Sequence, residues 1–224
     1  MGCSNSSRTF KRSSSFRDRY ILAEEALVST CKAFEFQSCR IADLDLAINQ
    51  YANSSTLTEK QLRQGLASCG LQKSLGQSSE KLLKAFRTCD CSYYVCHIGA
   101  LGALLGSGTV RNRAILVFNN YDQQCRGEFD FEDFKDYLKL VVQLEFSVLP
   151  GLAIDLYPAE EDEICLYAQY MKRKFNKLAA MEISLWCSRF GDAITKSQFK
   201  AELKREDFRS LFDLKALREA LLQF

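Results

Sequence analysis

Apolar side chains recur at steps of three and four along most of the chain after Tyr20, as they do on one face of an α-helix. Residues 160–188 have the longest regular stripe, and we expect them to form one amphipathic helix. Segments with similar spacing lie at 20–36 and 206–223. The stripe of the long helix consists of Ile164, Tyr167, Met171, Phe175 and Leu178. This periodicity predicts an all-α protein.

Helix-end signals divide the pattern into shorter helices. Thr58 with Gln61, and Thr195 with Gln198, have the spacing of a capping box, in which two side chains satisfy free backbone amides at a helix start. Gly70 stands where helices often end on a left-handed glycine. We therefore expect helices to begin after the two threonines and one helix to end near Gly70.

Glycine and proline mark two larger interruptions. Gly106-Ser107-Gly108 breaks the helical pattern near the middle of the chain and is a candidate hinge between two halves. Pro150-Gly151 and Pro158 bound a predicted linker that precedes the long helix.

Composition restricts the class of protein. At 224 residues the chain suits one or two domains, and 47% apolar with 26% charged residues is typical of a globular protein. The formal charge of +2 is too small to indicate nucleic-acid binding. No uninterrupted run of about 18 apolar residues is present, so we expect no membrane-spanning helix.

The ten cysteines and the single histidine also bear on function. Without an export signal the thiols should face a reducing compartment, so we expect free cysteines rather than a disulfide framework. We expect five of them to be small core residues: Cys31, Cys39, Cys69, Cys165 and Cys187. His97 is the only histidine, which argues against the common enzyme mechanisms that need one in the site.

The N-terminus carries signals for lipid attachment. Gly2 follows Met1 and Ser6 is the sixth residue, which is the pattern for N-myristoylation, and Cys3 is a natural site for palmitoylation. One acyl chain gives only reversible binding, whereas a second chain or a basic patch makes the anchor stable. The first 20 residues have a single acid, Asp18, and five bases: Arg8, Lys11, Arg12, Arg17 and Arg19. A chance match in a disordered serine-rich tail is the alternative.

The loop at 122–133 carries the most specific chemical signal. It has five acidic residues against one arginine, a balance that favours a cation. The loop resembles the calcium loop of the EF-hand family. Asp122 takes the first position, Gly127 the sixth, where the turn needs a positive φ, and Phe129 the apolar eighth, which in the family pairs with a partner loop as a short strand.

Three positions depart from the family pattern, and one of them is the twelfth, where Asp133 is shorter than the usual glutamate. Gln124 is a neutral donor, and Arg126 offers no oxygen at the fifth position. The resemblance implies about five oxygen ligands, whereas calcium takes about six to eight, so we expect weak binding at most. A degenerate loop that keeps the turn and binds no metal is the alternative. The implied metal ligands are Asp122, Gln124, the carbonyl of Glu128, Asp130 and Asp133.

The same template fits three further loops. Leu57, Val95 and Ile194 suit the apolar eighth position in loops that lack most acidic ligands. The resemblance thus implies four helix-loop-helix units, similar to calmodulin-type and neuronal-calcium-sensor-like proteins. The units are expected near 38–66, 78–105, 110–141 and 175–205.

A cysteine-rich stretch offers a second possible metal site. Cys89, Cys91, Cys96 and His97 are four potential zinc ligands within nine residues. Their spacing differs from the usual pair of separated pairs, so small cysteines in a degenerate loop are the favoured interpretation.

Together these patterns predict an all-α protein of four EF-hand-type units in two lobes, with short paired strands in the loops. We expect an acylated tail at 1–19, an N-terminal lobe at 20–106, and a C-terminal lobe with a trailing helix at 109–224.

The expected function is regulatory rather than enzymatic. The protein would be anchored at the cytoplasmic face of a membrane by its acyl chains and basic tail, and would bind an amphipathic helix of a partner. It would work with at most weak calcium binding at the third loop. The alternative is a genuine calcium sensor switched by residues 122–133.

Overall fold

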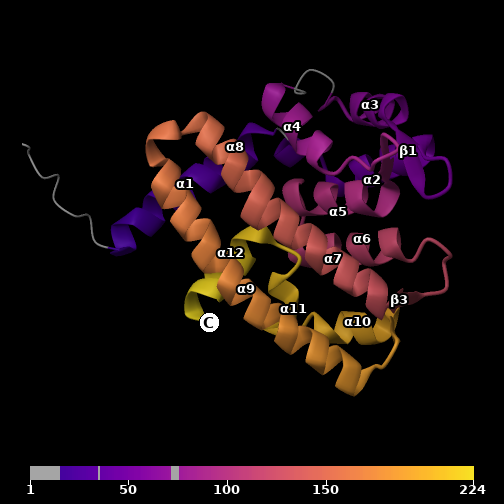
Figure 1. Cartoon of the computed structure of the whole chain (residues 1–224). Helices are drawn as coiled ribbons and strands as arrows, with labels where there is room; N and C mark the ends of the chain where they lie inside the picture. Colours follow the sequence, from indigo (N-terminus) through magenta and orange to yellow (C-terminus); the bar gives the residue numbers. More distant parts are fainter. Residues whose placement is uncertain (1–15, 35, 72–75) are drawn as a thin grey trace, which may run out of the picture.

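The computed structural model describes residues 16–34, 36–71 and 76–224 (Figure 1). The predicted lipid sites Gly2 and Cys3 lie outside these residues. The described chain is mostly helical and has two small antiparallel sheets, which confirms the all-α prediction at this level. The helices up to the chain centre are α1 (Phe16–Ala33), α2 (Ile41–Tyr51), α3 (Glu59–Ser68), α4 (Gln77–Ala85), α5 (Val95–Leu105) and α6 (Val110–Tyr121).

The second half is built around one long helix. This helix, α9 (Glu161–Arg189), agrees with the predicted span of 160–188 to within a residue. It runs beside α7, η3 and α8 (Figure 1). The other elements are α7 (Phe131–Gln143), η3 (Leu144–Val148), α8 (Leu149–Leu156), α10 (Lys196–Glu202), α11 (Glu206–Ser210) and α12 (Leu214–Gln223), with 3-10 turns η1 (Phe36–Ser38) and η4 (Pro158–Glu160).

Four three-residue strands each join two helices. They are β1 (Thr56–Thr58), β2 (Ser92–Tyr94), β3 (Glu128–Asp130) and β4 (Ala193–Thr195). β1 pairs with β2, and β3 pairs with β4, both antiparallel. Phe129 lies opposite Ile194, and both side chains are fully buried. The helix–loop–strand–helix order therefore occurs four times.

One predicted strand position is wrong. Leu57 lies opposite Tyr93, not opposite Val95. Tyr93 is buried, and Val95 instead begins α5, where its amide donates to the carbonyl of Ser55. Because side chains in a strand alternate between faces, a shift of two residues keeps the inward face and changes only which apolar residue occupies it.

The local helix signals were predicted correctly. Both capping boxes are formed, at Thr58 with Gln61 and at Thr195 with Gln198. Gly70 has a φ of +78°, the left-handed conformation expected beyond a helix end.

The predicted linker at Pro150 is helical instead. α7, η3 and α8 follow one another without a break, and Pro150 is a buried residue near the start of α8. η3 is a π-helical turn that widens the helix just before the proline. The expected C-terminal helix over 206–223 is divided into α11 and α12, because Asp213 caps a new helix by accepting from the amide of Ala216 at 2.9 Å.

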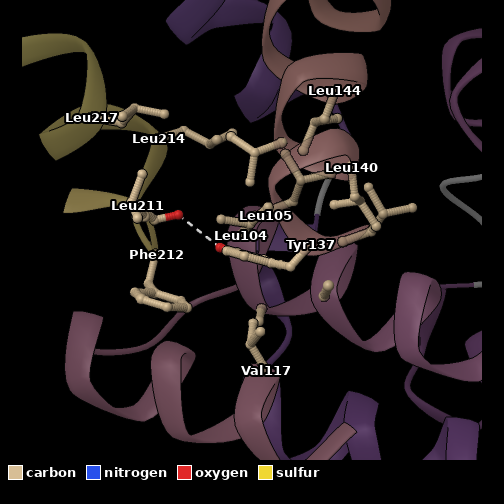
Figure 2. Close-up of a cluster of buried hydrophobic side chains, with 14 of the residues drawn as sticks. Leu104, Leu105, Val117, Tyr137, Leu140, Leu144, Leu211, Phe212, Leu214 and Leu217 are labelled. Carbon is tan, nitrogen blue, oxygen red and sulfur yellow. Dashed lines mark hydrogen bonds between the residues drawn. The ribbon is translucent and has the colours of Figure 1, made fainter. Parts of the chain in front are cut away.

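One cluster of buried residues extends through both halves of the described chain. Figure 2 shows its centre, where the Tyr137 hydroxyl donates to the carbonyl of Leu211 at 2.7 Å. The Tyr137 ring stacks on Phe212, with 5.2 Å between ring centroids. This cluster joins α5, α6 and α7 to the last two helices.

The cysteine predictions hold only in part. Cys31 and Cys39 are buried, whereas Cys69 and Cys165 are half-buried. The prediction for Cys187 is wrong, because this residue is exposed on α9 while the neighbouring Trp186 takes the core position.

The break at Gly106-Ser107-Gly108 is present between α5 and α6, and its backbone is held in place. Ser107 exchanges backbone hydrogen bonds with the segment before α2, accepting from Ile41 and donating to Cys39. A Cβ on Gly106 would lie 2.6 Å from the carbonyl oxygen of Gly102. The division into lobes at 20–106 and 109–224 stays a prediction.

Candidate functional site: the 122–133 loop and a groove between α7 and α9

Asp122 organises the predicted calcium loop through its carboxylate. Its Oδ1 accepts from the backbone amide of Arg126 at 2.8 Å, and its Oδ2 accepts from that of Gly127 at 2.7 Å. Gly127 has a φ of +75°, as the predicted sharp turn requires. Both carboxylate oxygens are thus engaged in holding the turn.

Arg126 brings a positive charge into the same loop. Its guanidinium pairs with the carboxylate of Asp130, four residues on, just before α7 begins. The hydrogen bond to Asp130 raises the pKa of Arg126. The Arg126 side chain therefore balances the charge of Asp130, which is one of the predicted metal ligands.

The remaining predicted ligands belong to three parts of the loop. Gln124 is exposed, Glu128 lies in β3 opposite Thr195, and Asp133 lies in the first turn of α7. Burial, followed by the nearby charges of Asp130 and Asp136, raises the pKa of Asp133. Within the described ranges, no three His, Cys, Asp or Glu residues are placed to hold a metal ion. Calcium binding at the loop stays a prediction.

The four possible zinc ligands differ in their burial and in their contacts. Cys89 and Cys91 are exposed. Burial raises the pKa of the Cys96 thiol to about 12, which disfavours the thiolate that zinc requires. His97 Nε2 lies 2.7 Å from Oδ2 of Asp136, so the imidazole bridges α5 to α7.

A groove that we did not predict from the sequence lies between α7, η3 and α9. Its volume is about 560 Å³. The floor of the groove is apolar and is formed by side chains of both helices. Polar and basic side chains lie beside this floor. The lining residues are Lys135, Leu138, Lys139, Val142, Gln143, Ser147, Phe175, Asn176, Ala179, Ala180 and Ile183.

The groove exists because α9 is apolar over a wider arc than its core stripe. Phe175 belongs to the predicted stripe and is fully buried, whereas Ala179 and Ile183 continue beside it and are only half-buried. Val142 on α7 is likewise half-buried. This second stripe of Ala179 and Ile183 is the sequence signal that could have indicated the groove.

The charged residues that line the groove are both basic. Lys135 and Lys139 line it, and no acidic side chain is among the lining residues. Lys135 pairs with Glu132 and its Nζ lies 4.8 Å from the centroid of the Phe131 ring. Lys139 is exposed and has no ion-pair partner in the described part of the chain. α12 contributes none of the lining, so the last helix leaves the groove open.

A buried cluster of charged side chains connects α1, η3, α9 and α12. Arg218 on α12 donates to Glu145 on η3 at 2.6 Å and to Glu24 on α1 at 2.8 Å. The Tyr167 hydroxyl of α9 donates to the same Glu24. Burial raises the pKa of Glu145 to about 7, and its Oε2 has no hydrogen-bond partner among the described residues.

The helical stretch Phe131–Leu156 is long and apolar enough on average to cross a membrane. Its most apolar window is 61% buried within the protein, as the core helix of a globular protein also is. From the sequence we expected no membrane-spanning helix, because no uninterrupted apolar run is long enough. Phe131–Leu156 nevertheless has a high mean hydropathy, because an average over a window allows a few charged residues.

No family model, curated protein or solved structure matches this chain.

Proposed function

We propose that this protein is a membrane-anchored adaptor of the EF-hand type, which binds an amphipathic helix of a partner in the groove between α7 and α9. It acts at the cytoplasmic face of a membrane through acyl chains on Gly2 and Cys3. It is a regulatory protein rather than an enzyme, and it binds calcium weakly at most.

Three features support the EF-hand part of the proposal. The order helix, loop, strand, helix repeats four times, and the loop strands pair two by two. Phe129 and Ile194, at the predicted eighth positions, lie opposite each other. Asp122 and Gly127 form the turn at the first and sixth positions.

The ion pair of Arg126 with Asp130 supports action without calcium. A site for calcium needs carboxylates that are free to face the ion. Here one carboxylate faces a guanidinium, and Asp122 is engaged with two amides.

The groove is the observation that carries the adaptor function. It is open and apolar on its floor, and its two walls come from helices α7 and α9. Grooves of this kind accept the apolar face of an amphipathic helix. Its volume of about 560 Å³ suits several large side chains of a partner.

Site-specific photo-crosslinking on membranes tests the proposal. A photoreactive amino acid replaces Ala180, an exposed residue of the groove, or Ala201, an exposed residue of α10 outside it. The full acylated chain is irradiated in cells, and crosslinked peptides are identified by mass spectrometry. We expect position 180 to react with a helical segment of a membrane-associated protein, with or without a calcium chelator, and position 201 not to react with it.

Equal crosslinking from both positions, or none from position 180, would contradict the adaptor function. Crosslinks that require calcium and disappear in Asp122→Ala would instead support the calcium sensor.

A further inference from the structure

The charge on the groove restricts which helix it accepts. We infer that the partner is an amphipathic helix that carries acidic side chains along the side of its apolar stripe that lies against α7. This inference rests on the groove function proposed above, and it adds the chemical class of the partner.

The floor of the groove has the spacing of a surface that binds a helix. On α9, Phe175, Ala179 and Ile183 follow one another at steps of four, so they lie along one face of that helix. At a rise of 1.5 Å per residue, this face spans roughly 12 Å, or about two turns of a docked helix. A partner therefore needs apolar side chains at steps of three and four over at least that length.

Positive charge stands on one rim of the groove. Lys135 and Lys139 lie one turn apart on α7. The opposite rim on α9 consists of Asn176 and Ala180, which have no charge. A carboxylate beside Lys139 would be attracted, because this ammonium group forms no ion pair in the described part of the chain, whereas Lys135 is already paired with Glu132.

A third lysine, Lys172, also favours a partner helix with acidic side chains. Lys172 precedes Asn176 by one turn of α9, so it lies on the same face of that helix, and it is exposed. No acidic residue occurs on α9 between Glu163 and Glu182. A basic partner helix would therefore meet like charge along the groove and at this end of it.

The two occupants that this chain itself offers carry the wrong charge. Residues 1–15 contain Arg8, Lys11 and Arg12 and no acidic residue, so by its sequence this segment offers no carboxylate to the lysine rim. A second copy docked groove to groove would present the same patch, because a two-fold interface is formed by one patch on both subunits, and no acidic side chain lines that patch.

Two designed peptides test the sign of the partner. Both have the same apolar stripe and a length of about 18 residues, and they differ only in having glutamate or lysine on both flanks of the stripe. Binding to the full chain is followed by fluorescence anisotropy at low and high salt. We expect the glutamate peptide to bind about tenfold more tightly, and salt to reduce the difference.

Charge reversal at one rim residue gives the matched comparison. Lys139→Glu changes an exposed side chain that has no ion-pair partner among the described residues, so the fold should persist, which circular dichroism checks. This variant should lose about fivefold in affinity for the glutamate peptide and gain affinity for the lysine peptide. Lys200→Glu, on the exposed side of α10 outside the groove, should change neither.

The outcomes separate the two proposals. Tighter binding of the lysine peptide overturns the acidic partner and leaves the groove function standing. Failure of both peptides to bind overturns the groove function as well. A dimer in sedimentation velocity that Ile183→Asp abolishes would make a second copy the occupant, which also overturns the acidic partner.

Discussion

Arg126 and Asp130, four residues apart in the loop before α7, form an ion pair across the turn. In the same loop, Asp122 holds the amides of Arg126 and Gly127. The turn is therefore stabilised by contacts within the chain, and the charge of one carboxylate is balanced by a side chain that the loop itself supplies.

Removing the internal cation should improve calcium binding. Arg126→Ser frees the Asp130 carboxylate and adds a hydroxyl, so we expect the affinity for calcium to rise about tenfold, since ligand charge sets affinity in such loops. Titration calorimetry measures it. Arg111→Ser, an exposed change on α6, is the control. Equal heats from wild type and Arg126→Ser would refute the balancing role.

Loss of the Asp122 carboxylate should loosen the turn. Asp122→Ala leaves two backbone amides without their acceptors and should lower the free energy of unfolding by about 1–2 kcal/mol, without calcium present. Asp192→Ala changes an exposed acid of the fourth loop and should stay within about 0.5 kcal/mol. Urea unfolding in a chelator measures both variants, and equal losses would exclude this role for Asp122.

Stability should depend on pH through Glu145. Burial raises its pKa from 4.5 to about 7, so between these values the folded state holds a proton that the unfolded state has released. This group thus contributes stability below pH 4.5 that is lost as pH rises through 7, by up to about 3 kcal/mol. Relative to Glu145→Gln, the wild type should weaken over this interval in urea unfolding. Parallel pH profiles would contradict the raised pKa.

A methyl group at the break before α6 should destabilise the protein. In Gly106→Ala the new Cβ meets the carbonyl oxygen of Gly102 at 2.6 Å and Ile41 at 2.8 Å, so we expect a loss of about 1–3 kcal/mol. Gly151→Ala on α8 meets nothing within 4 Å and should stabilise by about 0.5–1 kcal/mol. Thermal unfolding compares the pair, and an unchanged Gly106→Ala would mean that this segment yields easily.

Membrane attachment should depend on the second residue. If the proposed anchor is present, Gly2→Ala removes the predicted acylation site and should move the protein from the membrane to the soluble fraction. Cys3→Ser should release only part of it, because one acyl chain and the basic tail remain. Fractionation of cells measures both, and full retention of Gly2→Ala would refute the anchor.

Signals contained within a few residues could be predicted from the sequence. Thr58 and Thr195 satisfy amides three residues away, so their capping boxes depend on little else. Phe129 and Ile194 were both assigned to the eighth loop position, and the structure has them opposite each other. Tyr93 was missed, because an apolar residue two positions later fits the same strand face.

Features formed by distant residues could not be predicted. Glu145 and Arg218 are 73 positions apart, and each stands as a single charge within an apolar helical stripe. Nothing local indicates that the two meet. The continuity of α7 with α8 also depends on packing, since Pro150, a residue that usually interrupts a helix, follows a π-helical turn and is buried in the core.

The pairing of β3 with β4 has a consequence for synthesis on the ribosome. Phe129 can pair with Ile194 only after about 65 further residues have been synthesised. At a translation rate of 5–20 residues per second, this is a delay of roughly 3–13 s. β1 and β2 are much closer in sequence, so their units can pair first. The nascent third unit therefore exposes the inward face of its strand until translation is almost complete.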